Sequence, residues 1–239
     1  MTAKYCLIVL IILVALQAST FKAAGQSSTV DYSTILGNHW KAAETWVSNN
    51  EFWIRPEIEQ YNISYNEAVA VIFPEVVRFS IMRDSRDKAI LKALYVNNGK
   101  PYADFSIGIL RMKPSFAEAV RQEMSLVDDS RLQKILSRRH SYMDERRYRA
   151  MISDELEDIR VQISYVTAYM LLYANKPAMP EGEERIRLLA AGYNETPVMD
   201  AERLRLKADE KLFGTDTVTE EKYFYCDVAL FWYRQHQDD

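Results

Sequence analysis

Residues 65–80 are the part of this sequence that most constrains the fold. Within them only Glu67, Glu75 and Arg78 carry a charge, and apolar side chains take most of the other positions. A helix that is apolar nearly all round belongs at the centre of a domain. Ser64 followed by Glu67 has the spacing of a capping box, which marks the start of a helix. We therefore expect a central helix that carries the carboxyl group of Glu75 into the core.

The rest of the chain also favours helices. Seven glycines and seven prolines in 239 residues are few helix breakers, and the alternation typical of strands is almost absent. Helical patterns cover residues 38–53, 65–80, 84–96, 114–125, 130–175, 183–193 and 220–235. The fifth range is long enough for either one helix or two. The predicted fold class is mainly α.

The N-terminal segment has the pattern of a secretory signal peptide. Lys4 precedes an apolar run from Cys6 to Leu16, and the small residues at 23–25 fit a cleavage site. The run is shorter than the roughly 20 residues that span a bilayer, so we expect no stable membrane span after its removal. The predicted organisation is a signal peptide (1–25), a flexible leader (26–37) and a helical domain (38–239), exported to the periplasm or cell envelope.

Charge and residue types exclude several classes of function. The net charge is −4, and removing residues 1–25 would make it more negative, so nucleic acid is not an expected partner. Cys226 would be the one remaining cysteine, which predicts a buried thiol and no internal disulfide. The three histidines, His39, His140 and His236, lie far apart. The sequence therefore predicts no metal site.

Three separated segments of the sequence are informative when they are taken together. They are Val69–Glu75, an apolar stretch that ends in proline and glutamate; Ser106–Ala117, a glycine-containing loop followed by Pro114; and Leu189–Asn194, which ends in tyrosine and asparagine. In this order they resemble the lytic transglycosylase group of the lysozyme-like superfamily. The resemblance implies a lysozyme-like fold with helices around the central helix. It implies that Glu75 is the catalytic acid. It also implies substrate-binding roles for Ser106, Gly108, Ile109, Arg111, Met112, Tyr193 and Asn194.

The activity that the resemblance implies is lytic cleavage of peptidoglycan. The muramic acid's own 6-hydroxyl attacks the anomeric carbon, the MurNAc-β-1,4-GlcNAc bond breaks and a 1,6-anhydro end forms. Because the attacking group is intramolecular, its effective concentration is high and one carboxyl group is enough. No metal or organic cofactor is implied, and the partners would be peptidoglycan glycan strands and an envelope protein. Burial favours a protonated Glu75, whereas pairing with Arg78 would favour the charged form.

Departures from the family pattern keep two alternatives open. Val76 stands where serine is usual, Arg111 where glutamine is usual and Thr196 where glycine is common. They motivate a catalytically inactive member of the fold that binds glycan or an envelope protein. The other alternative is a hydrolytic, lysozyme-type muramidase that pairs the same glutamate with water and a second carboxylate, for which Asp84 and Asp104 are candidates.

Some of the site residues also fit a purely structural interpretation. Asparagine commonly ends helices, so Tyr193 and Asn194 fit a helix C-terminus as well as a site. Gly108 fits either a turn or a close approach of backbone to a sugar. Met112 and Phe116 fit the core better than a cleft.

Overall fold

The computed structural model describes residues 30–81, 87–136, 143–174, 176, 179–195, 200–210, 213 and 223–237. The chain divides after Asp31, and Tyr32–Asp239 is one compact unit. Within the described ranges this unit is built from helices, and its β structure is limited to two isolated bridges. The mainly α class is therefore confirmed. The signal peptide predicted for 1–25 lies outside the described residues.

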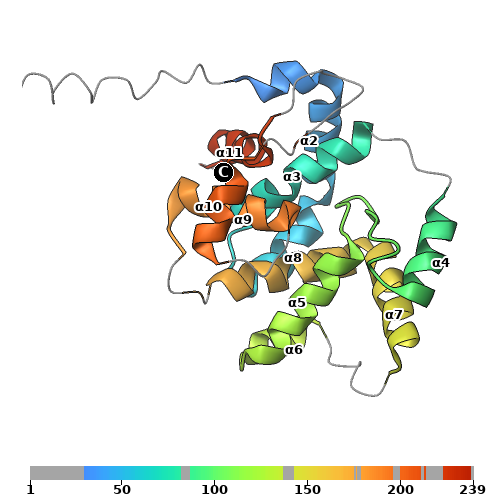
Figure 1. Ribbon diagram of the computed structural model, residues 1–239. Helices are drawn as coiled ribbons and strands as arrows, with labels where there is room; N and C mark the ends of the chain where they lie inside the picture. The colour runs from blue at the N-terminus through green and yellow to red at the C-terminus, as the bar shows by residue number, and fades with distance from the viewer. Residues whose placement is uncertain are drawn as a thin grey trace, which may run out of the picture. The chain divides into compact units, whose positions relative to one another are not determined.

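Figure 1 labels the helices of the described residues in chain order. They are α2 (Tyr32–Glu59), α3 (Tyr65–Ile81), α4 (Lys88–Asn98), α5 (Pro114–Leu126), α6 (Ser130–Ile135), α7 (Glu145–Glu157), α8 (Ile159–Ala174), α9 (Gly182–Asn194), α10 (Ala201–Ala208) and α11 (Tyr225–Gln235). No pattern in the sequence had predicted α10. None of the described helices combines the length and apolarity needed to cross a membrane.

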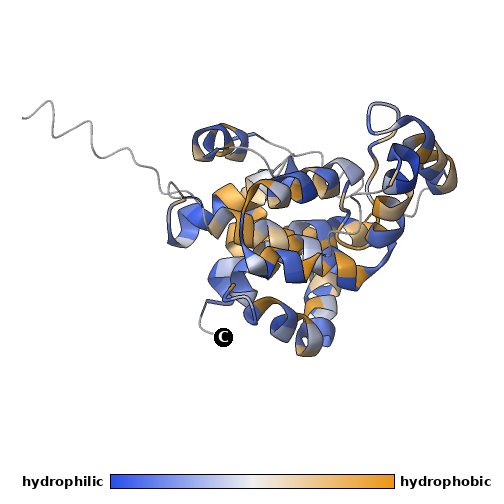
Figure 2. Ribbon diagram, turned by 90° about the horizontal axis from the view of Figure 1, so that it is seen from below, coloured by the Kyte–Doolittle hydropathy of each residue, from blue (hydrophilic) through white to orange (hydrophobic). Residues whose placement is uncertain are grey.

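Helix α3 lies at the centre of the unit, with α2, α8, α9 and α11 packed around it (Figure 1). Every residue from Ala68 to Val77 is buried, including Glu75. The hydrophobic colour gathers on the helices in the middle of the unit (Figure 2). The backbone N–H of Glu67 donates to Ser64 Oγ over 3.3 Å, which is one half of the predicted capping box. The central apolar helix is thus confirmed.

The packed unit begins earlier than the sequence had suggested. Helix α2 starts at Tyr32, and the side chains of Tyr32 and Leu36 are 5% and 1% exposed. Residues 32–37 therefore belong to the core-forming part of the chain, and the leader predicted for 26–37 extends too far. Gly37 interrupts the helix with φ 49° and ψ −116°, a conformation that a residue without Cβ adopts readily. The serine- and threonine-rich residues that precede Gly37 made the i, i+4 pair of Tyr32 and Leu36 hard to recognise in the sequence.

The described residues of the range 130–175 form three helices, so the prediction of one or two is wrong. Asp144 caps α7 by accepting from the backbone N–H of Arg147 over 2.8 Å. Asp158, between α7 and α8, accepts from the backbone N–H of Arg160 over 2.8 Å. These local bonds satisfy the free N–H groups of a new helix start. Helix α8 then runs through the core, with buried residues on all its faces.

Candidate functional site

Helix α3 brings Glu75 to the wall of a cavity of about 220 Å³. The Glu75 side chain is 8% exposed, so its carboxyl group is shielded from bulk water but adjoins a space that a ligand can enter. The cavity is lined by Glu75, Arg78, Ser106, Arg111, Met112, Lys113, Phe116, Tyr193, Asn194 and Glu195.

Most of the predicted site residues meet at this cavity. Those that line it together with Glu75 are Ser106, Arg111, Met112, Tyr193 and Asn194. They come from α3, from the segment before α5 and from the end of α9, which are the three segments of the family resemblance. Gly108 and Ile109 do not line it. Met112 and Phe116 are buried, as predicted, yet both form part of the cavity wall.

Each oxygen of Glu75 faces a guanidinium group. Arg78 Nη1 donates to Oε1 over 2.8 Å. Arg111 Nε lies 3.1 Å from Oε2, but no described donor, Arg111 included, makes a hydrogen bond to that oxygen. The pairing with Arg78, which the i, i+3 spacing allows, is therefore present, and Arg111 adds a second cation.

Arg78 is held firmly in place by several groups. Its guanidinium carbon lies 4.9 Å from the ring centroid of Phe213 and 5.4 Å from that of Tyr225, distances at which cation–π attraction operates. Its Nη1 also donates to Asn194 Oδ1 over 3.1 Å. Asn194 thus does two things: it is the last residue of α9, and its side chain orients the arginine that binds Glu75.

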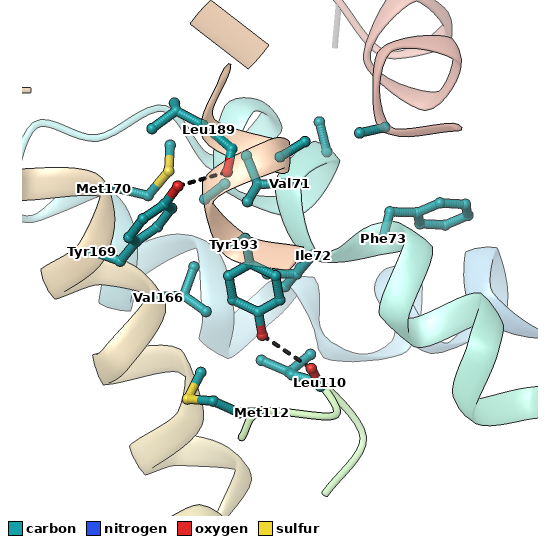
Figure 3. Packing of buried hydrophobic residues seen from close by; sticks show 14 of the residues in the cluster. Val71, Ile72, Phe73, Leu110, Met112, Val166, Tyr169, Met170, Leu189 and Tyr193 are labelled. Carbon is teal, nitrogen blue, oxygen red and sulfur yellow. Dashed lines mark hydrogen bonds between the residues drawn. The ribbon is translucent and has the colours of Figure 1, made fainter. Parts of the chain in front are cut away.

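Tyr193 fixes the loop that faces Glu75. Its hydroxyl donates to the carbonyl oxygen of Leu110 over 3.0 Å (Figure 3). Burial, and secondly the charge of Glu75, raise the pKa of Tyr193 well above its usual value, so the phenol stays neutral and remains a donor. Its ring packs edge-on against Phe116 at 4.9 Å between centroids.

Gln162 on α8 holds the same loop from the other side, and sequence reasoning missed it. Its side chain is fully buried. Nε2 donates to the carbonyl oxygens of Ile107 and Leu156, each over 2.7 Å, and Oε1 accepts from the backbone N–H of Leu110 over 3.2 Å. No spacing in the sequence identifies such a residue, because two of its three partners are backbone groups 52 and 55 positions away.

The role expected for Gly108 needs correction. Gly108 has φ +69°, and a Cβ at this position would come within 2.8 Å of Gln162 Cδ. The close approach that requires glycine is therefore to Gln162 and not to a sugar. Ile109 is likewise a partly buried residue packed against the core. Both residues shape the loop, and neither borders the cavity.

Of the described acids other than Glu75, Glu195 lines the cavity and Asp104, a predicted candidate, does not. Asp104 accepts from the backbone N–H and the hydroxyl of Ser115 over 3.0 and 2.7 Å, and does not line the cavity. Asp84 and Thr196 lie outside the described residues. Glu195, which the sequence analysis did not select, lines the cavity and lies 3.9 Å from Lys207. It follows Asn194 directly, so its proximity to the family motif was the available signal.

A second hollow of about 160 Å³ lies between α2, α6 and α8. Its ionisable side chains are those of Glu57, Tyr61, Lys134 and Arg160; Tyr61 is half-buried and the other three residues are exposed. It therefore lacks the buried carboxylate that distinguishes the cavity at Glu75. In the part of the chain that the structure describes, no group of three or more histidine, cysteine or acidic residues is placed to hold a metal ion.

Comparison of the chain with models of protein families, with curated proteins and with solved structures finds no match in any of the three. The segments named above and the geometry that surrounds Glu75 are therefore the observations from which a function is inferred.

Proposed function

We propose that the protein is an exported peptidoglycan lytic transglycosylase with a lysozyme-like arrangement of helices and Glu75 as its catalytic acid. One observation carries this proposal. Three segments that are far apart in the sequence meet at one cavity, around a buried carboxyl group whose Oε2 has no hydrogen bond from any described donor. An unbonded oxygen in a water-poor space is where a transferable proton is useful.

The proposed reaction uses the two oxygens of Glu75 differently. Oε1 stays bonded to Arg78, which fixes the carboxyl group. Oε2 gives a proton to the glycosidic oxygen as the bond to the anomeric carbon breaks. The 6-hydroxyl of the same muramic acid attacks that carbon and returns its proton to Oε2, so Glu75 is regenerated and a 1,6-anhydro end is formed. No second carboxylate, metal or organic cofactor takes part.

The cavity is smaller than the roughly 300–1,000 Å³ typical of sites that enclose a whole small molecule. In this proposal it surrounds only the bond to be cleaved, and the rest of the glycan strand lies on the adjoining surface. Peptidoglycan strands are the proposed partner, and an envelope protein that recruits the enzyme is a further one.

Two alternatives each have an observation in their favour. The guanidinium groups of Arg78 and Arg111 near Glu75 favour an inactive domain that binds glycan, since both oxygens of the proposed acid face a cation. Glu195 at the cavity wall favours a hydrolytic muramidase, because hydrolysis uses a second carboxylate to activate water.

Digestion of purified peptidoglycan, with the products identified by mass spectrometry, separates the three functions. We expect muropeptides with 1,6-anhydro ends. Reducing ends would reject the lytic reaction in favour of hydrolysis. Binding of the protein to peptidoglycan without any product would reject both enzymes and support the inactive domain.

A further inference from the structure

The two arginines beside Glu75 contact it differently, because Arg78 makes a hydrogen bond to the carboxyl group and Arg111 does not. Glu75 Oε2 and Arg111 Nε lie 3.1 Å apart and both are buried, yet neither makes a hydrogen bond to any described group. The two atoms attract each other by charge alone, without the alignment that makes an ion pair strong. A buried polar atom without a hydrogen bond is costly, so this contact is easily exchanged for a better one.

Arg111 is also held less firmly than Arg78. Its Nη2 donates to Ser106 Oγ over 3.4 Å, near the limit of a hydrogen bond. Its backbone has φ 49°, an uncommon conformation for a residue with a Cβ, and this turn directs the side chain to the cavity wall. Its side chain is 21% exposed, against 14% for Arg78. Most donors of its guanidinium are thus available to a ligand.

The cavity has an excess of positive charge. Arg78, Arg111 and Lys113 line it together with two acids, Glu75 and Glu195. An anionic ligand group would restore the balance. A carboxylate is a good partner for a guanidinium because two parallel hydrogen bonds can form, whereas the present contact of Arg111 with Glu75 provides none.

We propose that Arg111 couples the binding of a carboxylate on the glycan to the protonation of Glu75, an inference that rests on the proposed function. The ligand carboxylate draws the guanidinium away from Oε2. With that cation gone, Oε2 faces a space that is shielded from bulk water. Oε2 then takes up a proton, while Oε1 continues to accept from Arg78. Glu75 is protonated only when a strand that presents a free carboxylate to Arg111 occupies the site.

The other charged and titratable groups around Glu75 determine which side chains could take up the proton. They are Arg78 on α3, Arg111 and Lys113 before α5, Tyr193 and Glu195 at the end of α9, and Tyr225 on α11. Burial raises the pKa of both tyrosines well above their usual values, so they stay neutral. Glu195 is the one other acid of this set, which makes Glu195→Gln the matched control for Glu75→Gln.

Proton uptake on ligand binding tests the proposal without requiring cleavage. The probe is the disaccharide GlcNAc-β-1,4-MurNAc, which lacks the bond to be cleaved; N,N′-diacetylchitobiose is its neutral counterpart. Titration calorimetry at mildly acidic pH, in two buffers with different protonation enthalpies, gives the protons taken up. We expect a substantial fraction of one proton with the anionic disaccharide and none with the neutral one.

Four variants identify the side chain that takes up the proton and the cation that responds to the ligand. Glu75→Gln should abolish the uptake, and Glu195→Gln should preserve it. Arg111→Gln should abolish the coupling and weaken binding of the anionic disaccharide at least about tenfold, whereas Lys113→Gln should weaken binding and leave the uptake in place. Equal uptake with both disaccharides, uptake that survives Arg111→Gln, or no binding of the anionic disaccharide would overturn the proposal. Cleavage without uptake rejects only the role of Arg111; uptake without cleavage rejects only the transglycosylase.

Discussion

Substitution of Gly108 by alanine is the change whose effect the structure specifies most fully. Two separate costs follow from the geometry. Alanine at φ +69° costs about 1–2 kcal/mol because its Cβ crowds the backbone. That Cβ would also lie 2.8 Å from Gln162 Cδ, and such overpacking costs about 1–3 kcal/mol. We expect Gly108→Ala to lower the free energy of unfolding by about 2–5 kcal/mol, the sum of the two.

A second variant separates the two costs. Gln162→Ala removes three hydrogen bonds and leaves the buried N–H of Leu110 without its partner, which costs about 2–4 kcal/mol. In the double variant the steric clash is gone, so the loss should be smaller than the sum of the single losses by about 1–3 kcal/mol. Gly182→Ala is the matched control, because Gly182 has φ +61° and open space where its Cβ would be.

Urea denaturation of the wild type and five variants, including Gly182→Ala combined with Gln162→Ala, followed by circular dichroism, measures these energies. At this chain length each kcal/mol also shifts the melting temperature by about 2–4 °C. Gly182→Ala should show only the backbone cost and no coupling to Gln162→Ala. Additivity of Gly108→Ala and Gln162→Ala within about 0.5 kcal/mol would refute the assignment of Gly108 to contact with Gln162.

Two further predictions concern buried side chains near the core. Tyr193→Phe leaves the carbonyl oxygen of Leu110 without the hydroxyl donor at 3.0 Å, and should reduce the free energy of unfolding by about 1–3 kcal/mol in urea denaturation; an unchanged midpoint would contradict this. Cys226 is 2% exposed, and burial raises its pKa to about 12, so the thiol should not react with a maleimide at pH 8 until the protein is unfolded. Labelling of the folded protein at the rate of a free thiol would contradict the burial.

The elements that the sequence predicted best are those governed by local pattern. Helix α3 was predictable because its apolar residues leave no polar face. The spacing of Glu75 and Arg78 indicated that they would pair if both faced the same side of that helix. Pro114 at the start of α5 similarly follows from the fixed φ of proline. In each of these cases the deciding interactions lie within one or two helical turns.

The site itself depends on contacts that no local pattern encodes. Gln162 bonds to backbone groups 52 and 55 residues away, so nothing around it in the sequence marks it. The contact of Arg111 with Glu75 requires a turn in which Arg111 has positive φ, a conformation that sequence does not predict for arginine. The family resemblance selected segments that meet at the cavity, but within them it could not separate Arg111, which lines the cavity, from Gly108 and Ile109, which shape the loop.

The proposed function requires that the Glu75 carboxyl group transfers the proton. The most direct measurement compares the rate of formation of 1,6-anhydro ends by Glu75→Gln with that by Glu118→Gln. Glu118 is a partly buried glutamate that accepts from Tyr95 over 2.7 Å and lies outside the cavity. Both variants are assayed at a temperature where circular dichroism shows them folded. We predict that Glu75→Gln is slower than the wild type by about 10²–10⁴ and that Glu118→Gln is close to it. A Glu75→Gln rate equal to that of Glu118→Gln would contradict the account.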